Sequence, residues 1–592
     1  MIKKVLKKNG TYIVILAILT VICAVFTGLF YVPYFTSNDD LLLRSVMSGA
    51  YTGTPSAYLI YIMYPLGLVF KALYKVLPNV AWYELFTFSA HFVCIFLISV
   101  RLDAVFFAHK EEIRKYGYLR VVLSTAFFFV IYCIHLRYTI ENQYTVLAGL
   151  LAATSLFYFS TFSLCESKKE YVLCAVITLI TFALSLWLRK EACFMILPMF
   201  LFSLASRVIS GIKKHKKIRQ ILILPGMIFA ILLLSLFIHK AAYNKPEWKE
   251  FEAFNKARTD VYDYGLMPAF SDNKDFYESL GVGEDEYTAF TEYTLNLTDR
   301  DDASNIERMA LKQKSIQKEW EQYYSVPKKI IKDTFASFKE MGRYYAGSTA
   351  FIFGVTVFFV GLFVWIRRKN ALPFLVIMAS VIYFAVFTAY FTYLNRLLDR
   401  VFVPFLYALL VVFVAEYVFI VQDNGFAFFE AKKSRLFGMI LAVFAAVVML
   451  FTSWKSAGRN QNYYAAKSEA FNEINNYIEN HPDNVYMITQ SVNATQCKAL
   501  FSGHYDPVNS VRTVDWCYQS PLMKEKYQML GIKDSASSLR NENVYVLMAD
   551  FVNPQYAVNL VNKDGEWTNA VKTDEIKAGN TIVNVWKTEE VR

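Results

Sequence analysis

Long apolar runs alternate with short polar segments along the first three quarters of the chain. Each run approaches the roughly 20 residues that an α-helix needs to cross the hydrocarbon core of a bilayer. The sequence therefore predicts an α-helical polytopic membrane protein. The twelve runs cover residues 11–35, 57–78, 81–101, 119–137, 144–165, 171–188, 192–209, 219–240, 348–366, 371–393, 401–421 and 435–453.

Positive charges between the runs predict the orientation, because Lys and Arg are enriched in cytoplasmic loops. Four lysines precede the first run, and the segment 101–120 is also basic. Both lie inside only if two runs, rather than three, cross the membrane before this segment. The run 57–78 is the exception, since it carries Lys71 and Lys75, and a lysine at mid-bilayer costs at least about 2.5 kcal/mol. We place this run in the outer interface, which leaves eleven spans, with the N-terminus inside and the C-terminus outside.

This orientation divides the chain into a membrane domain, 1–453, and a soluble extracytoplasmic domain, 454–592. The membrane domain carries an outer loop, 36–80, with interfacial helices, and a large outer loop, 241–347, in which residues 303–325 read as a helix. In the C-terminal domain a helical pattern is followed by short apolar segments rich in β-branched and aromatic residues. These patterns predict a small α/β domain with a helix over 468–479 and strands over 485–488, 544–548 and 581–586.

Composition agrees with a membrane protein. The 592 residues are 55% hydrophobic, whereas soluble domains average about 45–50%. The net charge of +11 comes from loops between spans, and no basic-aromatic nucleic-acid module is present, so we expect no nucleic-acid partner. Six of the eight cysteines lie within or beside spans. Cys497 and Cys517 lie in the C-terminal domain, and the sequence leaves open whether they pair.

Two adjacent carboxylates, Asp39 and Asp40, follow the first span at its outer mouth, after Asn38. One interpretation is a helix N-cap, because Asn and Asp favour helix starts and suit the helix dipole. Capping needs only one of the three residues. We therefore predict that Asp39 and Asp40 form a catalytic pair in which one carboxylate acts as a general base at the membrane surface.

Several charged side chains at predicted outer turns are candidates for substrate binding. Arginine suits phosphate, because its planar guanidinium donates two parallel hydrogen bonds. An ordinary interfacial charge cluster, or a pair formed by Asp399 with Arg396, is the structural alternative. Arg396 and Arg400 are four residues apart and would share one helix face. The predicted substrate-binding residues are Arg189, Lys190, Glu191, Arg396, Arg400, Arg258 and Asp260.

Other ionisable residues carry weaker signals. Arg258 and Asp260 stand near two tyrosines in a polar-aromatic segment of the type that contacts sugars. Glu141 lies at another outer turn and is a lesser candidate for a metal ligand or second acid. His91 and His135 fit core or interfacial positions better than ligand positions.

This inventory fits a sugar donor carried on a polyprenyl phosphate. The phosphate leaving group needs its developing charge neutralised, and the acceptor hydroxyl needs a carboxylate to take its proton. One displacement from the opposite face inverts the anomeric carbon.

The order of these features resembles the GT-C superfamily of polyprenyl-phosphate-dependent glycosyltransferases, which includes protein O-mannosyltransferases and aminoarabinose transferases. The resemblance covers 1–453. It is carried by an N-in first span, an outer loop opening with paired acids, an interfacial segment with Tyr64-Pro65-Leu66, and a second span that leads to a basic loop.

The resemblance implies a base or metal ligand at Asp39 or Asp40, and a lipid phosphate held by Arg189, Arg396 or Arg400. It further implies a multi-pass protein of the cell membrane with an extracytoplasmic active site. Its partners would be membrane lipid, a polyprenyl-phosphate sugar and a glycan, lipid or protein acceptor. No cofactor is certain, and a divalent metal is possible. Many members carry Asp-Glu where this chain has Asp-Asp, which leaves open the acting residue and the metal. The chain lacks the Trp-Trp-Asp motif of oligosaccharyltransferases, so we expect no sequon recognition.

Two other functions compete with this one. A polysaccharide polymerase or ligase that uses lipid-diphosphate oligosaccharides would share the many spans and outer arginines, but would not need paired acids or a soluble C-terminal domain. A transporter or flippase usually shows internal repeats and ionisable or helix-breaking residues at mid-membrane. Here the charges gather at the span edges, which favours surface chemistry.

Overall fold

Helices make up most of the described part of the protein. The computed structural model describes residues 9–108, 117–213, 218–294, 302–323, 332, 336, 371–394, 396–422, 432–458, 460–493, 497–503, 505–513, 515–554, 559 and 568–590. Within these ranges nine helices are long and apolar enough to cross a membrane. They are α2 (Asn9–Phe30), α5 (Trp82–Asp103), α7 (Gly117–Ile140), α8 (Tyr144–Thr161), α9 (Lys168–Leu188), α10 (Lys190–Lys213), α11 (Ile218–Ala242), α18 (Ala371–Tyr393) and α19 (Asp399–Gln422).

These helices match nine of the eleven predicted spans. The predicted span 435–453 lies within α20 (Lys432–Ala457), which packs against α7. The predicted span 348–366 lies outside the described residues. The excluded run 57–78 contains α4 (Tyr64–Val76), whose 13 residues extend only about 20 Å and fall short of a bilayer core of about 30 Å. The membrane character is thus supported, whereas the count of eleven and the orientation stay predictions.

Helix α8 forms the centre of the bundle, in contact with α5, α9, α10 and α19. It is apolar on all sides, as expected for a helix enclosed by others, and 94% of its span is buried, compared with 22% for α2 and for α11. Gly149 lets α19 approach closely, because a Cβ at this position would overlap Pro404. The N-terminus of this buried helix supports the candidate site.

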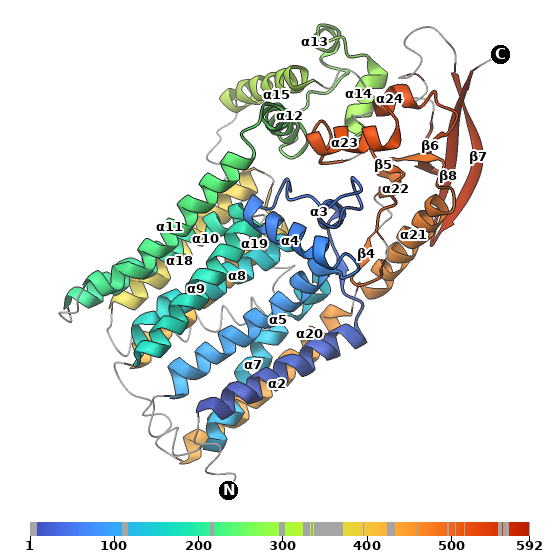
Figure 1. Cartoon of the computed structure of the whole chain (residues 1–592). Coiled ribbons are helices and arrows are strands. Elements are labelled where there is room, and N and C mark those ends of the chain that lie inside the picture. The colour runs from blue at the N-terminus through green and yellow to red at the C-terminus, as the bar shows by residue number, and fades with distance from the viewer. Residues whose placement is uncertain are drawn as a thin grey trace.

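The polar elements gather at one end of the bundle (Figure 1). The loop 36–80 contributes α3 (Asn38–Ser48), and the long loop 241–347 forms a helical cluster around its own apolar core. The helix predicted over 303–325 is confirmed as α15. The helices of the cluster are α12 (Pro246–Tyr262), α13 (Lys274–Glu278), α14 (Glu284–Thr291) and α15 (Ala303–Tyr323).

The C-terminal part contains a five-stranded sheet in the order β5-β3-β6-β8-β7. Strands β5, β3 and β6 are parallel, whereas β8 runs antiparallel to both β6 and β7. The predicted helix and the three predicted strands are confirmed as α21, β3, β6 and β8, and β5 and β7 were not predicted. The elements are α21 (Gln461–Glu479), β3 (Val485–Ile488), α22 (Gln490–Asn493), β5 (Ser510–Arg512), α23 (Pro521–Leu530), α24 (Ser535–Ser538), β6 (Val544–Ala549), β7 (Thr568–Ala578) and β8 (Thr581–Glu590).

A second, smaller sheet joins the C-terminal part to the helix bundle. Strand β1 (Tyr34–Phe35) pairs in parallel with β2 (Glu141–Asn142) and antiparallel with β4 (Lys498–Ala499). This sheet lies directly before α3 and ties the ends of α2 and α7 to the C-terminal region. Cys497 and Cys517 are buried free thiols, so they form no disulfide with each other.

Candidate active site

Helix α3 positions the two predicted catalytic carboxylates. Ser37 caps the helix, because its hydroxyl accepts a hydrogen bond from the backbone N–H of Asp39 at 3.1 Å. Asp39 and Asp40 therefore stand in the first turn, where the helix dipole favours negative charge. At the other end, Gly49 adopts a left-handed φ of 91°, and a Cβ there would clash with the backbone before Pro55. Since a serine caps the helix, capping uses neither carboxylate.

Asp40 points into the protein. It is fully buried, and its Oδ1 accepts a hydrogen bond from the Tyr83 hydroxyl at 2.6 Å. Burial raises the pKa of the Asp40 carboxyl to about 8; the Tyr83 hydrogen bond opposes this rise, and the charge of Asp39 adds to it. At neutral pH Asp40 is mostly protonated and suits a structural role better than that of a base.

Asp39 faces the cations. Its Oδ2 lies 3.7 Å from Nη1 of Arg400, which stands in the first turn of α19 and is 38% exposed. Burial raises the pKa of Asp39, while the charges of Arg400, Arg189 and Arg258 oppose the rise and that of Asp263 adds to it. Three of the predicted cations thus share one electrostatic environment with this carboxylate.

Arg189 occupies the corner between α9 and α10. Its Nη1 donates a hydrogen bond to the Tyr144 hydroxyl at 3.2 Å, and its guanidinium lies 5.1 Å from the centre of the Tyr61 ring. Its Nε pairs with Glu191 at 3.0 Å. Lys190 lies 4.0 Å from the same Glu191, and both of these side chains are substantially exposed. The corner therefore presents one ordered guanidinium above two tyrosines and a looser charge pair outside it.

Arg258 on α12 is buried, yet it has no carboxylate partner among the described residues. It donates hydrogen bonds to Asn255 and to the Tyr61 hydroxyl. Its guanidinium lies 4.0 Å from the centre of the Trp516 ring, which comes from the C-terminal part. Its charge acts on Asp39 without a direct ion pair between the two side chains in the described part of the chain, so the guanidinium suits a further anionic or strongly polar ligand.

Trp516 was not predicted as a site residue. Its ring contacts Tyr61 edge-on at 6.1 Å, and its indole nitrogen is buried with no hydrogen-bond acceptor in the described part of the chain. Nearby, Asp515 accepts a hydrogen bond from the Tyr51 hydroxyl at 2.6 Å and anchors the segment to the loop 36–80. No local pattern marks a tryptophan that contacts Tyr61 and Arg258, which lie far earlier in the chain, because these contacts depend on domain docking.

Two other predicted binding residues lie in different environments. Asp260 pairs with Lys314 of α15 at 2.9 Å, within the helical cluster of the long loop. The guanidinium of Arg396 lies 3.6 Å from the Asp263 carboxylate. It also donates a hydrogen bond to the backbone oxygen of Asp263 at 2.8 Å. The prediction that Arg396 and Arg400 share a helix face is wrong, because α19 begins at Asp399 and Arg396 precedes it.

The weaker candidates have structural partners. Glu141 pairs with Arg137 at 2.8 Å and accepts a hydrogen bond from Asn460. His91 and His135 are buried in the bundle and hydrogen bonded to each other at 2.6 Å, and His135 also bonds the Tyr407 hydroxyl at 2.5 Å. Both histidines thus occupy the core, as expected.

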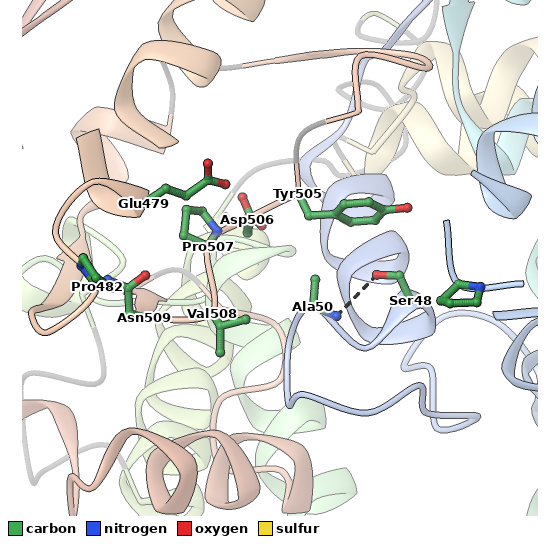
Figure 2. A pocket seen from close by; sticks show the side chains of 10 residues that line it. Ser48, Ala50, Glu479, Pro482, Tyr505, Asp506, Pro507, Val508 and Asn509 are labelled. Atoms are coloured by element: carbon green, nitrogen blue, oxygen red, sulfur yellow. Dashed lines mark hydrogen bonds between the residues drawn. The ribbon is translucent and has the colours of Figure 1, made fainter. Parts of the chain in front are cut away.

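A separate pocket of about 400 Å³ lies between the end of α3 and the C-terminal part, lined among others by Glu479, Tyr505 and Asp506 (Figure 2). Its buried carboxylate is already paired, since Asp506 contacts Arg512 at 2.6 Å. Despite burial, Arg512 holds the pKa of Asp506 below its usual value. The pocket lies beside the C-terminal end of α3, roughly 14 Å along the helix from Asp39. It is therefore separate from the place where Asp39 lies near the arginines.

The described residues at the candidate site provide no set of ligands of the kind that binds a metal ion. Among the described residues no three His, Cys, Asp or Glu side chains gather to hold an ion. The side chain of Asp40 is also turned toward Tyr83. We therefore derive no reaction step through a metal.

The arrangement combines one ionisable carboxylate, three arginines and three aromatic side chains at the polar end of an apolar bundle. It can accept a proton and bind an anion in the same place. In comparisons with known proteins, the chain matches no protein-family model, no curated protein and no solved structure.

Proposed function

We propose that the protein transfers a sugar from a polyprenyl-phosphate donor to an acceptor hydroxyl at the outer face of the membrane, with inversion at the anomeric carbon. The observation that carries the proposal is the placement of Asp39 among Arg400, Arg189 and Arg258. This group lies at the end of the bundle where the polar elements gather (Figure 1).

Asp39 acts as the general base in this reaction. It takes the proton of the acceptor hydroxyl while the acceptor oxygen forms a bond to the anomeric carbon. A raised pKa suits the role, because a base works best when its pKa approaches the operating pH. Asp40 supports the helix turn that holds Asp39 and takes no proton itself.

The arginines stabilise the leaving group. As the bond between the anomeric carbon and the phosphate oxygen breaks, the electron pair stays on the phosphate, which needs no proton but does need its charge neutralised. Arg258 is the best placed, because it has no carboxylate partner among the described residues. Arg400 and Arg189 exchange or share their present partners, Asp39 and Glu191, when the phosphate enters.

Tyr61, Tyr144 and Trp516 line the remaining sides. Aromatic side chains provide apolar surface for a sugar ring or the first isoprene unit, and their polar atoms orient the ligand. The indole N–H of Trp516, which has no acceptor in the described part of the chain, donates to an oxygen of the donor.

The test is to reconstitute the purified protein in lipid and supply labelled polyprenyl-monophosphate sugars with a mixed pool of acceptors. Transfer of label that requires Asp39 supports the proposal. A parallel arm offers lipid-diphosphate oligosaccharides; transfer only from these identifies a polymerase or ligase. Absence of transfer from either class, with a folded protein and a range of sugars, would remove the enzyme proposal.

The predicted orientation needs its own test, because the site must face the outside. A cysteine at Thr54, an exposed position in the first outer loop, should react with an impermeant thiol reagent in intact cells. A cysteine at Lys168, exposed at the opposite end of the bundle, should react only after lysis when it is placed in a Cys165→Ser background. The reverse result places the site in the cytoplasm and rejects the proposal.

A further inference from the structure

A second polar cluster lies at the far end of the bundle from Asp39. It forms where α8 ends in the short helix η2 (Phe162–Leu164) and the chain turns into α9. Since α8 has 18 residues, this cluster lies about 27 Å from the candidate active site. It has no part in the proposed reaction.

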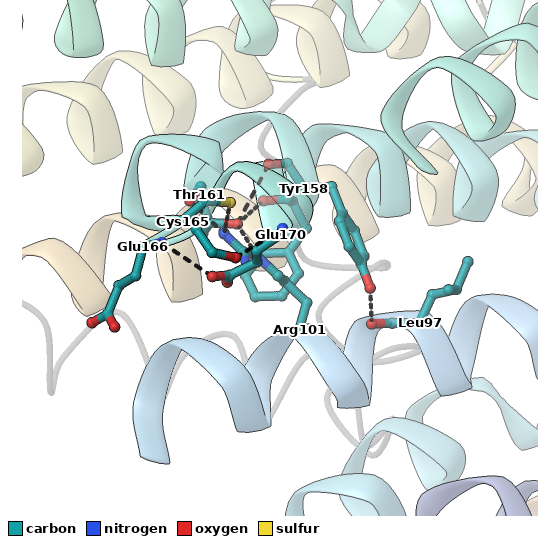
Figure 3. A network of polar contacts seen from close by, with 9 residues as sticks. Leu97, Arg101, Tyr158, Thr161, Cys165, Glu166 and Glu170 are labelled. Atoms are coloured by element: carbon teal, nitrogen blue, oxygen red, sulfur yellow. Dashed lines mark hydrogen bonds and ion pairs between the residues drawn. The ribbon is translucent and has the colours of Figure 1, made fainter. Parts of the chain in front are cut away.

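Arg101 on α5 organises the cluster (Figure 3). Its Nε donates to the Thr161 hydroxyl at 2.9 Å and its Nη2 to the Thr161 backbone oxygen at 2.6 Å. Its Nη1 pairs with Glu170 at 2.9 Å. Because three contacts fix the guanidinium, it is presented rigidly to any further neighbour.

That neighbour is Cys165. Nη2 of Arg101 donates a hydrogen bond to its sulfur at 3.6 Å (Figure 3). Cys165 is partly exposed, whereas Cys94 and Cys193 are fully buried. A second thiol, that of Cys174 on α9, is hydrogen bonded to the same sulfur. The sulfur of this partly exposed residue therefore contacts both a fixed cation and another thiol.

We propose that Cys165 is a reactive thiolate and that peroxide joins it to Cys174 in a disulfide. The thiolate attacks hydrogen peroxide and becomes a sulfenic acid, with release of hydroxide. The Cys174 sulfur then attacks the sulfenic sulfur, the S–O bond breaks, and water leaves once the thiol proton is transferred. Two thiols and one peroxide give one disulfide and two waters.

Electrostatics agree with this assignment. The hydrogen bond from Cys174 lowers the pKa of the Cys165 thiol, and the charge of Arg101 lowers it further. Burial and the charge of Glu170 act in the opposite direction but do not cancel the effect. A neighbouring arginine is a recognised means of activating a cysteine. In the predicted orientation this end faces the cytoplasm, where thiols are normally kept reduced.

The first experiment measures the alkylation rate of Cys165 by iodoacetamide at pH 7, by peptide mass spectrometry of the purified full-length protein. The reference is the Thr54→Cys variant in a Cys165→Ser background, which places an exposed thiol outside any helix N-terminus. Cys165 should react at least about threefold faster, although it is less exposed. Arg101→Lys, which keeps the charge but loses the planar fork, should slow the reaction severalfold.

The second experiment adds hydrogen peroxide and maps disulfide-linked peptides. Wild type should yield a Cys165–Cys174 link, and Cys174→Ser should instead accumulate a sulfenic acid that dimedone traps. Thermal melting checks that the variants fold. Alkylation no faster than at the reference cysteine, or no link under peroxide in folded wild type, overturns the inference. Sugar-transfer activity does not enter either readout, so the two proposals fail independently.

Discussion

Replacement of Asp39 or Asp40 by asparagine separates the two carboxylates most directly. Asparagine keeps the shape of each side chain but cannot accept the acceptor's proton. The structure gives the two positions opposite roles, because Asp39 faces arginines and Asp40 bonds to Tyr83. Asp39→Asn should abolish most transfer, and Asp40→Asn should retain most of it.

The magnitudes follow from the environments. Loss of a general base typically costs about 10²- to 10⁴-fold in rate, so we expect Asp39→Asn to fall in that range. With a pKa of about 8, Asp40 is roughly ten parts protonated to one part ionised at pH 7, because each pH unit is a factor of ten. A neutral amide should replace it with about a threefold change or less.

Stability gives an independent readout of the same difference. Asp39→Asn removes a 3.7 Å pair with a 38% exposed Arg400, which is worth only about 0–1 kcal/mol. The folded-state pKa of Asp40 is raised from 3.8 to about 8, so the folded protein binds this proton more tightly than the unfolded chain. Wild type should therefore lose stability as pH rises from about 4 to about 8, by at most about 1.4 kcal/mol per unit. Asp40→Asn should lack this loss.

The assay combines initial rates of transfer with melting temperatures at several pH values in one lipid-like detergent. The reasoning is refuted if Asp40→Asn loses as much activity as Asp39→Asn while both remain folded. It is also refuted if the melting temperatures of Asp40→Asn and wild type change in parallel with pH.

Three further predictions test other parts of the molecule. Trp516→Phe should lower transfer by about tenfold or slightly more, since one hydrogen bond to a charged group is worth about 1.5 kcal/mol. Trp586→Phe on β8, another indole without an acceptor in the described residues, should leave transfer unchanged, and equal effects would deny Trp516 a role in binding. Gly149→Ala should destabilise the protein by about 1–3 kcal/mol in denaturation assays, because overpacking is costly. Gly226→Ala should be nearly neutral, because there is open space around Gly226. Equal melting temperatures of the two variants would contradict the close contact between α8 and α19. Lys498→Met should stabilise the protein by about 1 kcal/mol, with the largest gain below pH 6. The reason is that Lys498 has no hydrogen-bond partner in the described part of the chain, and burial and Arg44 lower its pKa to about 6, so wild type must charge a buried amine in acid. A lower melting temperature of the variant at pH 5 would refute this.

The sequence identified the elements whose formation depends on local composition. Run length and side-chain pattern predicted nine of the spans, the exclusion of 57–78 and strands β3, β6 and β8. These features are visible in the sequence because hydrophobic burial determines both the length of an apolar run and its periodicity. The acidic start of α3 was also visible. The sequence did not identify Ser37 as the N-cap of this helix, because Ser37 and the three residues after it all favour a helix start.

The remaining features required the tertiary structure, because they depend on which distant segments meet. The helix boundary at Asp399 decides that Arg396 and Arg400 do not share a face. Burial against Tyr83 turns Asp40 inward and leaves Asp39 toward the arginines.

Long-range docking is the hardest part to read from sequence. Trp516 reaches Arg258 only because the C-terminal part packs onto the loop 241–347. A periodic pattern reports whether a side chain is buried, but not against which partner. The sequence by itself thus determined that acids and arginines occupy one end of an apolar bundle, and only the fold decided which of them face one another.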